Sequence, residues 1–257
     1  MPLIEKQLFE TVDKVDIAIN RLKTFEPEEG YYVAFSGGKD SSVILDLVRR
    51  SGCKYDAHYN LTTVDPPEVV QFVRTHKDVS TDLPEKTMWQ LIVENGMPPT
   101  RIARYCCQEL KERGGKYRRV ITGIRWEESA GRSKRQMTEP CRNGHKHYLH
   151  VIIDWTEAEV WEYIKKYEVP YCKLYDEGYK RIGCIMCPFK NKAGMVEDAE
   201  RFPKYYQAYM RAFQRMIDRC KMEGIDRSWE NGQAVMDWWI TNKLNSESED
   251  QLTFCFD

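Results

Sequence analysis

Apolar positions along the chain change repeatedly between two patterns. Short runs rich in Val, Ile and aromatic residues predict buried strands. These runs are 31–35, 54–60, 118–124 and 147–153. Between them, apolar residues recur at helical spacing and predict helices. These are 42–51, 67–76, 86–95, a helix through residues 106–107, and 156–167. Strands that alternate with helices predict an α/β fold with a doubly wound, mostly parallel sheet.

The two ends of the chain have a different pattern. Ile4–Phe25 predicts an amphipathic lead helix, and aromatic-rich helices are expected at 197–221 and 229–243. Aromatic stripes at helical spacing are typical of core or interface packing, with nucleobase stacking as the alternative. We therefore expect an N-terminal helix (1–27), a nucleotide-binding catalytic domain (28–190) and a C-terminal helical extension (191–257).

Composition narrows the class of protein. The chain has 257 residues, 42% of them hydrophobic, which is enough for one good core. No apolar run is long enough to span a membrane and no signal segment is evident, so we expect a soluble, cytoplasmic protein without membrane partners. In that compartment nine cysteines are not expected to form disulfides. The net charge of −1 argues against general nucleic-acid binding, although basic residues gather in 101–119.

A glycine-cornered loop joins the first predicted strand to the next helix. Such a turn presents free backbone N–H groups and the positive end of a helix dipole, which together bind phosphate. Adjacent glycines let an anion approach closely, and the serines add hydroxyl donors. The loop reads Ser36, Gly37, Gly38, Lys39, Asp40, Ser41, Ser42. It is not a Walker loop, and an ordinary strand-to-helix turn with a Ser N-cap is the alternative interpretation.

A second candidate anion site follows the strand at 118–124. Carboxyl ends of parallel strands share one edge of the sheet, so this segment is expected beside the glycine loop. Arg125 and Arg132 would supply charge-assisted hydrogen bonds and Ser129 a hydroxyl, with a solvated charged loop as the alternative.

Cysteines form two groups. Cys106 and Cys107 are adjacent, and Cys184 and Cys187 make a Cys-x-x-Cys. Together they could hold either zinc or a [4Fe–4S] cluster, and spacing does not decide between them. Buried inert thiols are the alternative interpretation, and they are expected for Cys53 and Cys220, which lie on otherwise apolar faces.

These motifs resemble a known superfamily over roughly residues 28–190. The glycine loop resembles the PP-loop, Ser-Gly-Gly-x-Asp-Ser, of ATP pyrophosphatases. The cysteine pattern resembles the iron–sulfur form of the phosphoadenosine phosphosulfate (PAPS) reductase family. That resemblance implies an adenine nucleotide alpha-hydrolase-like fold and a [4Fe–4S] cluster on Cys106, Cys107, Cys184 and Cys187. Similarity to sulfur-transfer enzymes of DNA phosphorothioation makes Cys172 a candidate alternate ligand.

The resemblance also implies a nucleotide site. ATP, or PAPS or adenylyl sulfate (APS), would bind in the loop at 36–42 with Mg²⁺. Lys39, Asp40 and Arg125 would be the catalytic residues, and Asp65 would lie against adenine and ribose. Gly123, Ser129 and Arg132 belong to the segment that grips the phosphosulfate or its equivalent.

Two features bear on the reaction. The loop is intact, whereas many sulfonucleotide reductases have a degenerate one, and Cys255 lacks the Glu-Cys-Gly-Leu-His setting of the reductases' catalytic cysteine. We therefore expect ATP-dependent adenylation of an acceptor, for example a nucleic acid, and then transfer of sulfur from a cysteine desulfurase-like donor. The alternatives are reduction of PAPS or APS to sulfite with a thioredoxin-like reductant, and a non-catalytic nucleotide and cluster sensor. A homo-oligomer is compatible with the sequence.

Overall fold

The computed structural model describes residues 3–6, 11–141 and 145–241. Its main sheet has six strands in the order β5-β4-β3-β6-β8-β7, and all neighbours are parallel except β7 and β8. The strands are β3 (Tyr31–Ala34), β4 (Tyr55–Asn60), β5 (Val79–Asp82), β6 (Arg119–Ile121), β7 (Thr138–Pro140) and β8 (His147–Leu149). The predicted doubly wound, mostly parallel sheet is confirmed.

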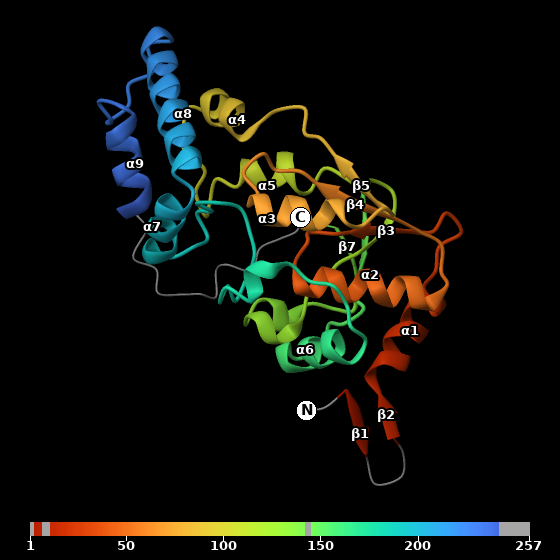
Figure 1. The fold of residues 1–257 in the computed structure, drawn as a ribbon. Coiled ribbons are helices and arrows are strands. Elements are labelled where there is room, and N and C mark those ends of the chain that lie inside the picture. Colours follow the sequence, from red (N-terminus) through yellow and green to blue (C-terminus); the bar gives the residue numbers. More distant parts are fainter. Residues whose placement is uncertain (1–2, 7–10, 142–144, 242–257) are drawn as a thin grey trace.

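Nine α-helices are described, some beside the sheet and some beyond it (Figure 1). They are α1 (Lys14–Thr24), α2 (Lys39–Ser51), α3 (Pro67–Arg74), α4 (Met88–Asn95), α5 (Tyr105–Leu110), α6 (Glu157–Lys166), α7 (Lys192–Arg201), α8 (Pro203–Met222) and α9 (Gly232–Thr241). None of the helices within these described ranges is long and apolar enough to cross a membrane.

The order of the strands creates a switch point at the centre of the sheet. From β3 the chain proceeds to β4 on one side, and it later returns to place β6 on the other side. In open α/β sheets, ligands bind at the carboxyl ends of the two strands that flank such a point. The loops that follow β3 and β6 therefore border the expected ligand crevice.

Among the described residues, two large hydrophobic cores and one small cluster (Tyr32, Val120, Cys141, Tyr148) hold the molecule together. In the first, α1, α2 and α6 pack side by side against one face of the sheet, around Val33, Ile121 and Leu149 (Figure 1). The second lies beyond the sheet and joins α4 and α5 to the C-terminal helices α7–α9. The predicted helical extension is therefore present, and it packs against helices that lie far before it in the sequence.

Several elements differ from the prediction. The lead helix over 4–25 is wrong in its first part, because Ile4–Lys6 (β1) and Thr11–Asp13 (β2) pair as an antiparallel hairpin. The helix begins only at Lys14, where the Asp13 side chain accepts from the backbone N–H of Val15 at 2.8 Å. The helix expected at 197–221 is two helices, α7 and α8, that meet at Phe202 with Pro203 opening the second. Strands β5 and β7 have no counterpart among the predicted elements.

Candidate nucleotide site and cysteine cluster

The loop after β3 has the geometry of an anion cradle. Gly37 has a φ of +74°, a backbone conformation that favours glycine. A Cβ there would also lie 2.9 Å from Val69 Cγ1, so both the backbone and the packing disfavour a side chain. Ser41 Oγ donates to the carbonyl of Gly38 at 2.8 Å and fixes the start of α2. The Ser42 hydroxyl is buried, and within the described part of the chain it has no hydrogen-bond partner. It is therefore a free donor at the helix start.

Lys39 is buried at the mouth of this loop. Its ammonium lies 3.3 Å from the carbonyl oxygen of Lys180, 3.3 Å from Glu157 Oε1 and 3.7 Å from Asp40 Oδ2. Its backbone N–H donates to the Tyr175 hydroxyl at 2.9 Å. Neighbouring groups thus hold the backbone N–H and the ammonium of Lys39 in place, and both are groups that phosphate oxygens could engage.

Asp40 and Arg125 join the two loops across the switch point. Arg125 Nε donates to Asp40 Oδ1 at 2.7 Å, and its Nη1 lies 3.0 Å from Glu127 Oε2. Arg125 is only 3% exposed. Burial opposes its charge, but the facing carboxylate of Asp40 leaves the Arg125 pKa above its usual value. A Cβ at Gly123 would lie 2.9 Å from Asp40 Cβ, so only glycine permits this approach.

Ser129 and Arg132 lie on the same loop as Arg125. The Ser129 hydroxyl accepts from the backbone N–H of Arg132 at 3.3 Å, and the Arg132 guanidinium pairs with Glu128. Burial lowers the pKa of Arg132. Nearby Arg181, from the segment before Cys184, also contributes positive potential there. The structure thus gathers four cations, Lys39, Arg125, Arg132 and Arg181, in one candidate anion region. The carboxylates of Asp40, Glu127, Glu128 and Glu157 pair with the first three of them.

Asp65 lies at the end of the loop after β4, close to the cysteines. Its carboxylate accepts from the backbone N–H of Thr62 at 2.7 Å, and it acts electrostatically on Cys184 and Lys111. The structure therefore puts this carboxylate beside the cysteines. Its predicted contact with adenine and ribose stays a prediction.

The four motif cysteines come together in the second core. Cys106 and Cys184 are buried there, and Cys107 and Cys187 pack against it. A hydrogen bond to Cys107, together with burial, raises the pKa of the Cys106 thiol, and the same hydrogen bond lowers that of Cys107. Burial raises the pKa of Cys184 to about 11, against the opposing influence of Lys111. Residues far apart in the sequence thus act on one another as one group.

Lys111 is a residue that the sequence reasoning missed. The negative potential of Cys184, and then of Cys187 and Cys107, raises the pKa of its ammonium. Lys111 therefore places a positive charge among the thiols. Its position four residues after Cys107, on the same helical face, is the signal that could have identified it.

Cys172 does not join this group in the structure. Cys172 is fully buried in the first core, where its charged neighbours are Glu68, Glu177 and Lys173. Its role as alternate ligand has no support from this placement. Cys255 lies outside the described residues.

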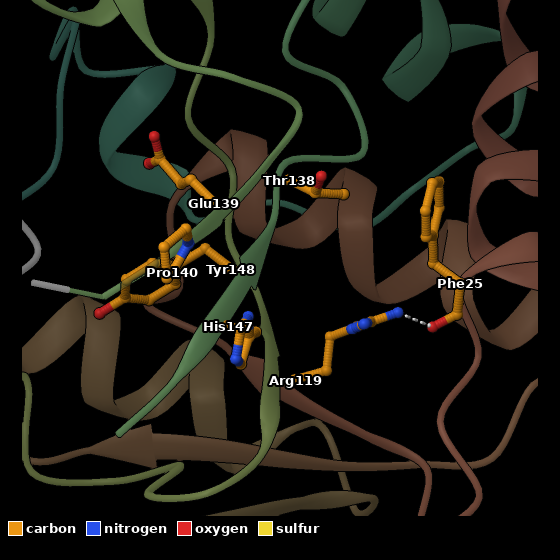
Figure 2. A pocket seen from close by; sticks show the side chains of 7 residues that line it. All are labelled: Phe25, Arg119, Thr138, Glu139, Pro140, His147 and Tyr148. Carbon is orange, nitrogen blue, oxygen red and sulfur yellow. Dashed lines mark hydrogen bonds between the residues drawn. The ribbon is translucent and has the colours of Figure 1, made fainter. Parts of the chain in front are cut away.

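A pocket elsewhere on the molecule is not part of this site. It has a volume of about 150 Å³ and is lined by residues of β7 and β8, by Arg119 of β6 and by Phe25 (Figure 2). The Arg119 guanidinium donates to the carbonyl oxygen of Phe25 at 2.7 Å. Its lining extends along all of β7, from Pro140 beside His147 to Thr138 beside Leu149, the last residue of β8. The glycine loop follows β3, which β6 separates from β8 in the sheet.

Several proteins with similar sequences are named as reductases of adenosine or phosphoadenosine phosphosulfate. The chain is 28% identical over 166 residues to adenosine 5'-phosphosulfate reductase of Oceanobacillus iheyensis, covering 60% of this chain and 69% of the relative. An uncharacterized protein of Methanocaldococcus jannaschii is 31% identical over 207 residues, covering 75% of this chain and 48% of the relative. The chain spans less than half of this relative and of a second one from the same organism, of which it covers 44%.

A solved structure shares the fold. The phosphoadenylyl-sulfate reductase of Candida auris, in its phosphate complex, superposes with a TM-score of 0.52 at 20% identity, over 65% of this chain and 87% of that one. The adenine nucleotide alpha-hydrolase-like fold expected from the sequence is thereby confirmed. The family model of the phosphoadenosine phosphosulfate reductase domain matches residues 30–190, which include both loops and all four clustered cysteines. The chain belongs to the phosphoadenosine phosphosulfate reductase domain family.

Proposed function

We propose that the crevice between the loops after β3 and β6 binds the phosphates of an adenine nucleotide. The observation that carries this proposal is the convergence of Lys39, Asp40 and Arg125 at the switch point, with Arg125 Nε 2.7 Å from Asp40 Oδ1. The start of α2 adds N–H groups and a positive helix dipole. Mg²⁺ would enter with the nucleotide and neutralise part of its charge.

We further propose that Cys106, Cys107, Cys184 and Cys187 hold a [4Fe–4S] cluster. Four clustered thiols with a cation among them fit the donor set of such a cluster. In the described ranges no three His, Cys, Asp or Glu side chains are arranged to hold a single metal ion. A four-iron cluster asks for wider spacing, because each thiolate binds a different iron. When bound, the cluster would supply electron-transfer or sulfur-carrying chemistry.

The reaction we propose is adenylation followed by sulfur transfer. An acceptor oxygen, for example of a nucleic acid, attacks the α-phosphorus of ATP, so that a new P–O bond forms and pyrophosphate leaves. The outer sulfur of a persulfide-bearing donor then attacks the activated acceptor and displaces AMP, which leaves acceptor and donor joined by an S–S bond. A second thiol cleaves that bond, so that the thiolated acceptor is released and the two thiols end as a disulfide. Lys39 and Arg125 would stabilise the charge that develops on the phosphate oxygens in the first step. The intact loop favours this reaction. The reductases act on a sulfate that is already adenylylated, so they release no pyrophosphate and need no site for it.

Reduction of PAPS or APS to sulfite is the second candidate. It is favoured by the names of the relatives, several of which are phosphoadenosine or adenosine phosphosulfate reductases. In that reaction a thioredoxin-like protein would supply the two electrons. The anion region of Arg125, Arg132 and Arg181 suits a phosphosulfate as well as a triphosphate.

One set of assays separates the two reactions. Protein purified without oxygen is incubated with ATP, Mg²⁺ and candidate nucleic-acid acceptors, and AMP and pyrophosphate are measured. A parallel reaction contains PAPS or APS with reduced thioredoxin, and sulfite is measured. The adenylation proposal expects AMP and pyrophosphate that depend on acceptor and disappear in Lys39→Ala. Sulfite without pyrophosphate would establish the reductase instead, and binding of ATP without either product would indicate a sensor.

A further inference from the structure

A buried carboxylate from the C-terminal helices faces the Cys-x-x-Cys turn. Asp198 lies on α7, outside the residues that the family model matches, and is 1% exposed. Its Oδ2 accepts from the backbone N–H of Met186 at 2.6 Å, and both of its oxygens lie 2.6 Å from Lys190 Nζ. Met186 is one of the two residues between Cys184 and Cys187. The carboxylate therefore contacts the turn at its middle.

The turn itself has a backbone conformation that needs support. Met186 has a φ of +54°, in the left-handed region that non-glycine residues seldom occupy. The neighbouring Ile185 is held on both sides, because its N–H donates to the carbonyl of Val64 at 2.8 Å and its carbonyl accepts from the Tyr209 hydroxyl at 3.2 Å. Asp198 and Tyr209 thus bring two C-terminal helices onto the same turn.

Burial of this carboxylate also argues for a specific role. A buried carboxylate is costly unless it is paired and hydrogen-bonded, and a buried ion pair adds little stability over apolar packing. Asp198 has both a cation and a backbone donor, and the donor belongs to the segment between two cysteines. Groups that orient ligand-bearing segments of a metal site have a strong influence on metal affinity.

We infer that Asp198 is a positioning residue for the cysteine site: its carboxylate, paired with Lys190, fixes Met186 so that the thiols of Cys184 and Cys187 face those of Cys106 and Cys107. This inference rests on the proposed cluster. It assigns the C-terminal helices, which the family match leaves out, the function of completing the cysteine site.

The test compares three variants purified without oxygen and reconstituted with iron and sulfide. Asp198→Ala removes both contacts, whereas Asp198→Asn keeps an oxygen that can accept from Met186 N–H. Asp218→Asn, on the exposed side of α8, is the matched control. Iron and sulfide per chain are measured at limiting iron, together with the visible and electron paramagnetic resonance spectra. Calorimetry with ATP and circular dichroism report on the nucleotide site and on folding.

We expect Asp198→Ala to lower the apparent affinity for the cluster about 10-fold, with unchanged ATP affinity. Asp198→Asn should lie between it and the wild type, and Asp218→Asn should equal the wild type. Wild-type iron content and spectra in Asp198→Ala would overturn the inference. If Asp198→Ala does not fold, the test rests on Asp198→Asn. Wild-type iron content and spectra in Asp198→Asn would then overturn the inference.

A second readout separates this inference from the proposed cluster. In metal-free protein, the alkylation rates of the individual cysteines are measured by mass spectrometry. The inference expects Cys184 and Cys187 to react faster in Asp198→Ala than in the wild type, while Cys53 and Cys220 do not change. If the wild type takes up no iron, the proposed cluster fails. Unchanged rates at Cys184 and Cys187 would then reject the positioning role as well.

Discussion

At the scale of single residues, Gly123 gives a sharp test of the nucleotide site. A methyl group at this position would lie 2.9 Å from Asp40 Cβ and 3.3 Å from the Asp40 backbone carbonyl carbon, so Gly123→Ala must displace Asp40 or β6. We expect this substitution to disturb the contact with Arg125 and to weaken ATP binding about 10-fold, measured by calorimetry. Gly183→Ala is the matched control, because nothing lies within 4 Å of a Cβ there. Equal affinities for the two variants would argue against a nucleotide at the Asp40–Arg125 pair.

Lys111 is the second residue with a specific expectation. Its ammonium interacts with Cys184, Cys187 and Cys107, so it stabilises negative charge in the cysteine site. Replacing it by Met keeps the length of the side chain and removes the charge. A cluster gains negative charge on reduction, so we expect Lys111→Met to lower its midpoint potential and Lys111→Arg to restore most of it. Redox titration of anaerobic protein measures this, and equal potentials in all three proteins would contradict it.

The residues of the site differ in how far the sequence could identify them. The glycine loop and the Cys-x-x-Cys are local patterns, and each of their residues is identified by its neighbours in sequence. Asp198 has no such local pattern, because its role depends on which side chains the fold brings near it. For Lys111 the local signal is weak, since it consists of the spacing of four residues from Cys107. Lys39 is intermediate, since its place in the loop is evident from the sequence but its contacts with Tyr175 and Glu157 are not.

At the scale of elements, α6 tests the capping signal that the sequence displays. Thr156 Oγ1 accepts from the backbone N–H of Glu159 at 3.2 Å, and Glu159 Oε2 accepts from that of Thr156 at 2.6 Å. Thr156→Ala removes the first of these contacts, so we expect a loss of about 1 kcal/mol in the free energy of unfolding. Thr156→Ser keeps the hydroxyl and should stay near the wild type in urea titration. A variant with Ala as stable as the wild type would show that α6 is held by packing alone.

Elements are predicted well where one signal dominates and poorly where two compete. For α6 the capping box and the apolar spacing agree, and the helix begins where the box places it. In the N-terminal segment the apolar spacing suggests one long helix. Asp13, however, is an N-cap, so the helix begins after it and the residues before it are not helical. At Phe202–Pro203 the aromatic stripe continues while Pro203, which cannot donate a helical N–H, requires a new helix start. Strand β7 has no strand pattern of its own and forms by pairing with β8.

At the scale of the whole molecule, the convergence of distant segments is the least predictable property. Parallel strands place their carboxyl ends together, so the meeting of the two loops could be expected from the alternation of strands and helices. The meeting of residues 106–107 with 184–187 could be expected from the need of one metal site for four thiolates and from the family resemblance, but not from the alternation of strands and helices. The contact of α4, α5 and the cysteines with α7–α9 depends on packing among aromatic side chains, which a pattern of apolar positions does not specify.

The pH dependence of stability is a property of the whole molecule in which one residue has a clear role. His150 is fully buried, with Nδ1 2.7 Å from Thr122 Oγ1 and Nε2 3.0 Å from Glu139 Oε1. Burial lowers its pKa, opposed by Glu139 and assisted by the charges of Arg135 and Arg132. The unfolded chain therefore takes up a proton at a higher pH, about 6.5, than the folded one does. Stability contributed by neutral His150 is complete above that pH and is lost as pH falls below it.

Burial also lowers the pKa of His76, which adds to the pH dependence of stability. A variant of His150 alone is therefore needed to isolate its contribution. We expect the free energy of unfolding of the wild type to fall between pH 7 and pH 5 more steeply than that of His150→Gln, which cannot titrate. His147→Gln, at an exposed position of β8, should keep the wild-type slope. Urea titrations across this range measure all three slopes. Parallel curves for wild type and His150→Gln would mean that the pKa of His150 is the same in the folded and unfolded chains, and would contradict the lowering by burial. A shallower fall in the wild type than in His150→Gln would mean that Glu139 raises the pKa of His150 and keeps it protonated in the folded state.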